Sequence, residues 1–327
     1  MNTDEKVIKA DEKVIESGEK TAKVDAKPAQ ALPNRRKFLR GCLIGGIATP
    51  LGAGALGGST LYYARNIEPG WIDTTYQQMH LARLTSAFHG YRVVQITDIH
   101  ADDSFMTKDR LQKIVTMVNQ LRPDMIVITG DFVTRYIAGL SLTLVALSKL
   151  QAKDGVFGVL GNHDHPAGLD WVRGLLRIAK VQELPNQVHT VQRGDQMLHF
   201  IGMDDLWPSN EGTPAPVETH RPLLNQLTSS IPAEGAAILL VHEPDFADVA
   251  ASNRRIDLQL SGHSHGGQIC IPFHGPFFTP ALSHKYPSGL YHIENMQLYT
   301  NRGLGVLEIP MRFDCRPEIA VMDLAAA

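Results

Sequence analysis

Cysteine is scarce in this chain of 327 residues. The three cysteines, Cys42, Cys270 and Cys315, lie far apart, and none belongs to a Cys-x-x-Cys pair. Their spacing excludes a disulfide framework or a zinc ribbon as the element that organises the fold. A bridge between Cys270 and Cys315 stays open as an alternative, but two buried unpaired thiols is the interpretation that we favour.

An excess of charge of one sign is also absent. The chain has 31 Lys and Arg residues against 34 Asp and Glu residues, which leaves a formal net charge of -3. Proteins that hold nucleic acid by bulk electrostatics carry an excess of basic residues, so we expect no nucleic-acid partner. Hydrophobic residues make up 43% of the chain, which is enough to build the core of an ordinary globular domain.

Residues 1–33 lack the apolar side chains that a segment needs to fold alone. They contain an imperfect seven-residue repeat, 4–10 followed by 11–17, and we expect a disordered charged segment. The basic run Asn34-Arg35-Arg36-Lys37-Phe38-Leu39-Arg40 comes next, followed by a weakly apolar stretch without charge at 41–64. This succession at 34–64 is typical of a twin-arginine export signal.

The signal has two possible fates. Ala53-Gly54-Ala55 is a candidate cleavage site, whereas residues 41–63 are just long enough to stay as a membrane anchor. We therefore predict export by the twin-arginine (Tat) machinery to the periplasm, with or without an anchor in the membrane. The sequence does not decide whether the signal is cleaved.

Short apolar runs alternate with segments of helical spacing from residue 91 onward, which indicates a layered α/β or α+β domain. We expect a linker at 65–90 that leads into one catalytic domain at 91–327. Strands are predicted at 92–97, 125–129, 156–160, 198–203, 237–241 and 257–260, with more near the C-terminus. Helices are predicted at 108–120, 140–150, 169–179 and 221–227.

Five polar clusters follow predicted strands, which is where open α/β sheets place their ligands. They are Asp98-Ile99-His100, Gly130-Asp131, Gly161-Asn162-His163-Asp164, Val241-His242-Glu243 and Gly262-His263-Ser264-His265-Gly266-Gly267-Gln268. The first two are common by chance. The last is the most specific, because two histidines flanked by glycines suit neither a core nor a regular element.

The order and spacing of the five clusters resemble the calcineurin-like metallophosphoesterase family, over about residues 93–324. Three further motifs are similar to its bacterial exported or membrane-anchored branch, some of whose members are associated with hydrolysis of lipid A precursors. These motifs are Tyr286-Pro287-Ser288-Gly289-Leu290-Tyr291, Arg302-Gly303-Leu304-Gly305 and Arg316-Pro317-Glu318-Ile319-Ala320. The resemblance implies a four-layer α/β/β/α sandwich, with two mixed sheets flanked by helices.

The resemblance also implies a centre for two divalent metal ions, bridged by Asp131. The other ligands divide between the two ions: Asp98, His100 and His265 for one, and Asn162, His242 and His263 for the other. Oxygen and imidazole ligands suit manganese, iron or zinc better than calcium, and the sequence leaves the choice open. His163 matches a family histidine that protonates or stabilises the leaving oxygen, and Asp164 is a candidate to orient it.

Two metal ions about 3.5–4 Å apart suit phosphate-ester hydrolysis, since they yield a bridging hydroxide and neutralise the phosphoryl oxygens. We predict a metal-dependent hydrolase of a phosphomonoester, phosphodiester or pyrophosphate. The resemblance adds a candidate substrate, a lipid-linked or nucleotide-sugar pyrophosphate similar to UDP-2,3-diacylglucosamine. Two alternatives are a nuclease of the same superfamily, which the absence of a basic stripe disfavours, and a non-catalytic scaffold, which the complete ligand set disfavours.

Substrate selectivity in such a site comes from loops, and residues 204–220 and 270–288 are the candidates. His165 and His274 lie beside the motifs and are candidates to line the pocket. The remaining histidines carry no motif, and we expect them at the surface or satisfied in the interior: His80, His89, His189, His199, His220, His284 and His292.

Overall fold

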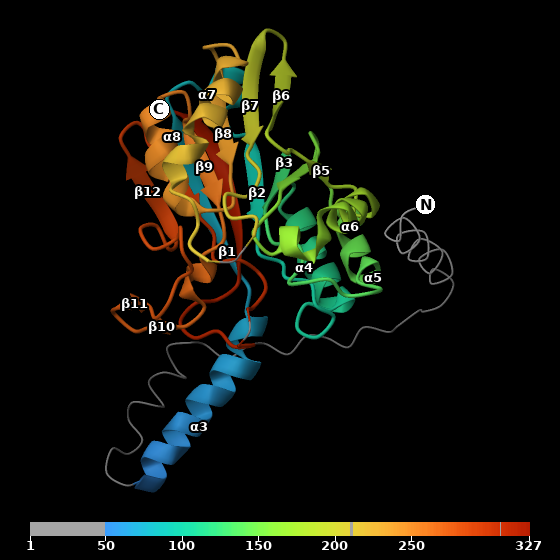
Figure 1. The fold of residues 1–327 in the computed structure, drawn as a ribbon, viewed down its shortest axis with the longest axis vertical. Helices are drawn as coiled ribbons and strands as arrows, with labels where there is room; N and C mark the ends of the chain where they lie inside the picture. Colours follow the sequence, from blue (N-terminus) through green and yellow to red (C-terminus); the bar gives the residue numbers. More distant parts are fainter. Residues whose placement is uncertain (1–49, 210–211, 308) are drawn as a thin grey trace.

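The computed structural model describes residues 50–209, 212–307 and 309–327. The predictions for the charged segment at 1–33 and for the twin-arginine motif lie outside these residues. Two mixed sheets of six strands each stand face to face, and helices cover their outer faces (Figure 1).

The first sheet has the strand order β1-β14-β2-β3-β4-β5, and its neighbours run parallel except for the antiparallel pair β14 and β2. Its strands are β1 (Asp73–Leu81), β2 (Arg92–Ile96), β3 (Met125–Thr129), β4 (Val156–Val159), β5 (Gln182–Glu183) and β14 (Glu318–Ala326). The predictions for β2, β3 and β4 are confirmed to within one residue.

The second sheet has the order β12-β13-β9-β8-β7-β6, with antiparallel pairs at its two edges. Its strands are β6 (Gln187–Arg193), β7 (Gln196–Gly202), β8 (Ala236–Leu240), β9 (Leu258–Ser261), β12 (Gly289–Ile293) and β13 (Met296–Thr300). The predictions for β7, β8 and β9 are confirmed to within two residues. A small hairpin of β10 (Cys270–Ile271) and β11 (Gly275–Pro276) stands apart from both sheets.

Three apolar cores separate four layers. In β3, Ile126 and Ile128 pack toward the helices, whereas Met125 and Val127 pack toward the second sheet, because side chains alternate along a strand. In β8, Leu239 belongs to the third core, between the second sheet and its own helices. The predicted four-layer α/β/β/α sandwich is therefore confirmed.

The helices that cover the first sheet are α4 (Lys108–Gln120), α5 (Ser141–Leu144) and α6 (Asp164–Ile178), and those on the second are α7 (Arg221–Ser229) and α8 (Ala247–Asn253). Helix α4 matches its prediction. The helix predicted at 140–150 divides into α5 and a 3-10 segment, Val145–Lys149. Helix α6 begins earlier than predicted, and the predicted start coincides with a kink at Gly168, whose φ is 111°.

We expected a linker at 65–90, but this segment contains strand β1, which pairs in parallel with β14 from Asp73 to Leu81. Met79 and Leu81 are buried in the core between the sheets. The polar run Thr74-Thr75-Tyr76-Gln77-Gln78 concealed the strand, because an edge strand exposes much of its length to water.

Helix α3 (Pro50–Asn66) precedes β1 and projects away from the sheets (Figure 1). In the part of the chain that the structure describes, no helix combines the length and the apolar character needed to cross a membrane.

The burial of β1 leads to a first prediction. Leu81→Ala should lower the free energy of unfolding by about 2–5 kcal/mol, because it opens a cavity between the sheets. Tyr76→Ala on the same strand should change it by less than about 0.5 kcal/mol, because the Tyr76 side chain is exposed. Urea denaturation measures both, and equal effects of the two substitutions would contradict the role of β1 in the core.

Candidate metal centre

Seven side chains of the predicted ligand set meet where five strands end. Asp98 and His100 follow β2, Asp131 follows β3 and Asn162 follows β4, all from the first sheet. His242 follows β8, and His263 and His265 follow β9, from the second. Both sheets therefore contribute to one site, and all seven residues are buried.

One group consists of Asp98, His100, Asp131 and His265, whose ligand-type atoms all lie within 4.8 Å of one another. His100 Nε2 lies 3.0 Å from His265 Nε2 and 3.3 Å from Asp131 Oδ2. His265 Nε2 lies 3.3 Å from Asp98 Oδ1. This set of two carboxylates and two imidazoles fits a divalent transition metal ion.

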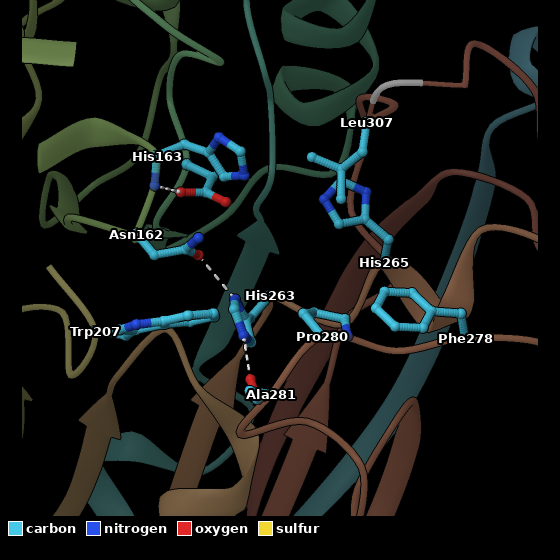
Figure 2. A pocket seen from close by; sticks show the side chains of 10 residues that line it. Asn162, His163, Trp207, His263, His265, Phe278, Pro280, Ala281 and Leu307 are labelled. Carbon is cyan, nitrogen blue, oxygen red and sulfur yellow. Dashed lines mark hydrogen bonds between the residues drawn. The ribbon is translucent and has the colours of Figure 1, made fainter. Parts of the chain in front are cut away.

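A second group forms around Asn162. Its Oδ1 lies 3.2 Å from His242 Nε2 and 2.9 Å from His263 Nδ1, a contact that Figure 2 shows as a dashed line. His242 Nε2 is also 3.2 Å from Asp131 Oδ2. The same carboxylate oxygen of Asp131 thus contacts both groups.

Backbone carbonyls fix which imidazole nitrogens face the centre. His242 Nδ1 donates to Thr129 O at 2.7 Å, and His263 Nε2 donates to Ala281 O at 2.7 Å. The opposite nitrogen of each ring is left to point toward Asn162 Oδ1. These ring nitrogens and the Asn162 oxygen converge on one point where a metal ion could bind them all, so the arrangement fits bound metal ions.

The charges of the site also favour a cation. Burial alone would lower the pKa of His242, but the carboxylates of Asp131 and Asp98 raise this pKa well above its usual value. Burial alone would raise the pKa of Asp131, yet the neighbouring His242 and His163 hold it well below its usual range. Burial lowers the pKa of His263 to about 3, which keeps that ring neutral and available as a ligand.

The backbone is strained at the same residues. Five of the seven have a positive φ: Asp98 (48°), His100 (46°), Asp131 (53°), His263 (67°) and His265 (52°). Residues other than glycine adopt this conformation at a cost of about 1–3 kcal/mol each, and they keep it only where the surroundings hold them. Strain on this scale is typical of functional sites.

His163 and Asp164 have different surroundings from those we expected. His163 Nδ1 donates to Thr134 O at 3.2 Å, so a backbone carbonyl orients the ring. The Asp164 carboxylate instead accepts from the backbone amides of Phe132, Val133 and Gly161, at 2.9, 3.1 and 3.0 Å. Thr134, and not Asp164, therefore makes the contact that orients the His163 ring. Asp164 instead links the loop after β3 to the loop after β4 through these hydrogen bonds. Burial raises the pKa of Asp164 to about 7.

A cavity of about 170 Å³ opens onto the centre. Figure 2 shows His163, Asn162 and Trp207 along one side, and Leu307, Phe278 and Pro280 along the other. Each predicted selectivity loop supplies an aromatic ring, Trp207 from 204–220 and Phe278 from 270–288.

Two expectations for the pocket lining are not met by the described residues. His165 pairs with Asp204 at 2.9 Å and does not line the cavity, and neither does His274. Leu307 lines the cavity but carried no signal in the sequence, because an isolated leucine in a loop has no recognisable pattern.

Cys270 and Cys315 are free thiols, as we favoured, although only Cys315 is fully buried. Cys270 Sγ donates to Gly266 O and Cys315 Sγ donates to His265 O, each at 3.2 Å. Both thiols therefore brace the turn that carries His265.

The comparisons with known proteins agree with this site. Residues 91–267 match the family described as calcineurin-like phosphoesterase. The uncharacterized metallophosphoesterase YkuE of Bacillus subtilis is 35% identical over 299 residues, which cover 89% of this chain and 97% of YkuE. Phosphodiesterase YaeI of Escherichia coli is 28% identical over 298 residues, with 89% and 99% covered. A transmembrane protein with a metallophosphoesterase domain from Danio rerio is 31% identical over 256 residues, with 76% and 56% covered.

The glycine of the Gly-Asn-His-Asp cluster packs directly against the shared carboxylate. A Cβ on Gly161 would lie 2.4 Å from Asp131 Oδ1, so the carboxylate would have to move. Gly161→Ala should weaken metal binding about tenfold or more, as loss of a ligand's supporting contacts does. Metal retained after dialysis against a buffered metal solution measures this. Gly70→Ala, where a Cβ meets nothing within 4 Å, is the control. Equal retention by both variants would contradict the prediction.

Proposed function

Since this chain belongs to the calcineurin-like phosphoesterase family, we propose that its seven converging side chains hold two divalent metal ions for phosphoester hydrolysis. The chain is a metal-dependent phosphoester hydrolase, and manganese, iron and zinc are the candidate metals. The observation that carries the proposal is the position of Asp131 Oδ2, 3.3 Å from His100 Nε2 and 3.2 Å from His242 Nε2. A carboxylate shared by two ligand groups is what a bridged metal pair requires.

The bound ions would activate a water molecule and neutralise charge on the phosphoryl oxygens. Asn162 adds an oxygen ligand without adding negative charge, so the centre keeps its attraction for a phosphate anion. His163 lines the cavity, and its Nδ1 is occupied by Thr134 O. Its Nε2 is therefore the atom left to protonate or stabilise the leaving oxygen, and we assign His163 that role.

The substrate class extends to phosphomonoesters, phosphodiesters and pyrophosphates. The name of the relative from Escherichia coli, a phosphodiesterase, supports testing phosphodiesters first. A lipid-linked or nucleotide-sugar pyrophosphate similar to UDP-2,3-diacylglucosamine is the specific candidate, and the motifs shared with the exported bacterial branch support it.

We further propose that the chain is exported by the Tat machinery and acts in the periplasm or at the membrane. The support is the pair Arg35-Arg36 followed by the uncharged stretch at 41–64. The relative from Danio rerio, whose name describes a transmembrane protein, adds support for membrane association.

Metal analysis and hydrolysis of bis(4-nitrophenyl) phosphate and 4-nitrophenyl phosphate test the catalytic proposal on the purified full chain. The wild type should hold about two equivalents of transition metal and hydrolyse at least one ester. Asp131→Ala should lose both metal and turnover. His163→Ala should keep its metal and lose about 10²–10⁴-fold in kcat. His89→Ala, an exposed histidine far from any motif, should resemble the wild type. A wild type that stays metal-free and inactive after manganese, iron and zinc are supplied would favour the scaffold alternative.

Cell fractionation tests the proposed route. Changing Arg35→Lys and Arg36→Lys together should retain the protein in the cytoplasm, because Tat recognition requires the arginine pair. Arg40→Lys, outside the pair, should leave export intact. The size of the exported product shows whether the signal is cleaved. Equal export of the wild type and the double variant would refute the Tat assignment.

A further inference from the structure

Exposed apolar side chains gather beside the candidate metal centre. Nine large hydrophobic residues are exposed among the described side chains, and five of them lie at or beside the β10–β11 hairpin: Ile271, Phe273, Phe277, Phe278 and Ile309, with exposed fractions from 46% to 107%. We call these five residues the apolar hairpin surface. A cluster of exposed apolar side chains of this kind marks a binding site for a ligand, a membrane or another protein.

A groove of about 620 Å³ runs along this surface. Its lining includes the exposed side chains of Phe277, Phe278 and Ile309 as well as His163 and the buried His265. It shares His163, His265, Phe278, Pro280 and Leu307 with the cavity over the metal centre. The groove is therefore continuous with the place where the phosphate group would lie, and its volume is that of a pocket for a small molecule.

The described residues of the groove wall offer few free polar side chains to a ligand. Among the described residues that line it there is no Asp, Glu, Lys or Arg. The side chain of Gln268 is already engaged, because its Nε2 donates to Ile309 O and its Oε1 accepts from Leu307 N. Ser264 Oγ accepts from Gly266 N. A nucleoside or a sugar would give up hydrogen bonds to water for few partners among these side chains, whereas a hydrocarbon chain has no hydrogen bonds to lose.

The apolar hairpin surface also adjoins the end of helix α3. Cys270 N in β10 donates to Phe313 O at 2.8 Å, and the Phe313 ring meets the ring of Tyr63 in α3 edge to face, with centroids 6.5 Å apart. Leu61 and Tyr62 of the same helix are exposed. Figure 1 shows α3 and the β10–β11 hairpin on the same side of the molecule. The C-terminal end of helix α3 therefore lies next to the apolar hairpin surface.

We propose that the groove binds the hydrocarbon chain of a lipid phosphoester whose phosphate group lies at the metal centre. This assignment rests on the proposed function, because the centre must act on phosphoesters for the groove to serve as a substrate site. It adds the side chains that would hold the hydrocarbon part of a lipid substrate, which the metal ligands alone do not specify. Each methylene group that is buried in such a groove should raise the affinity of the ligand by up to roughly fourfold.

Calorimetric titration of the metal-loaded full chain with octylphosphonate and methylphosphonate tests the groove without requiring turnover. Octylphosphonate should bind at least roughly 30-fold more tightly, since only part of its chain needs to be buried to reach that ratio. In a variant that combines Phe277→Ser and Ile309→Ser, the ratio between the two affinities should fall to about threefold or less. Both side chains are exposed, so the fold should survive. Tyr76→Ser, an exposed aromatic residue on β1, is the matched control and should keep the wild-type ratio.

Hydrolysis of the 4-nitrophenyl diesters of methyl and octyl phosphate separates this proposal from the proposed function. Turnover of both esters with equal kcat/KM, together with equal phosphonate affinities, would leave the catalytic proposal standing and overturn the groove. A chain-length preference in binding without hydrolysis of either diester, of bis(4-nitrophenyl) phosphate or of 4-nitrophenyl phosphate would keep the groove as a binding site and remove the catalytic proposal.

Sedimentation of the same proteins checks the competing occupant, a second copy of this chain. If the wild type is a dimer that the double substitution dissociates, and if neither protein distinguishes octylphosphonate from methylphosphonate, then the surface is a self-association interface and the groove proposal is overturned.

Discussion

The organisation of this molecule depends on one carboxylate oxygen that lies between two sets of imidazoles. Asp131 Oδ2 contacts His100 from the first sheet and His242 from the second, and all three side chains are buried. Bringing so many ligand atoms together is unfavourable without a cation, so the fold has to hold them. The two sheets do this by directing the ends of β2, β3, β4, β8 and β9 toward one point.

The loops that follow these strands are held by contacts that no ligand motif displays. Asp164 accepts from amides in the loops after β3 and β4, and Asp98 accepts from His263 N at 3.1 Å, which joins the first sheet to the second. These hydrogen bonds offset the strain of the positive φ angles, because they hold the turns in a backbone conformation that is unfavourable for residues other than glycine. The carboxylates in the motifs thus serve the geometry of the site as much as its charge.

The sequence predicted much of this arrangement, and its failures have physical causes. The central strands were predictable because strands buried on both faces are continuous apolar runs, as in Met125–Thr129. Strand β1 was not, because an edge strand such as Asp73–Leu81 has a mostly polar sequence. The ligand set was recognisable from motif order, whereas the role of Asp164 depends on which amides come near it after folding. The apolar character of the groove wall depends on Leu307 and Ile309, and only the fold brings these residues beside Phe278.

The position of β14 has a consequence for how the chain reaches its folded state. This strand lies between β1 and β2 in the first sheet, and its ion pair with β2 joins Arg92 to Asp323, 231 residues apart in the chain. The loop that must close before these strands meet is long, so this pairing comes at a high entropic cost and favours slow folding. Until β14 pairs, β1 and β2 each lack the neighbour that lies between them in the folded sheet, and unpaired strand edges favour wrong pairing with other chains. This topology therefore makes folding of the first sheet dependent on the last strand of the chain.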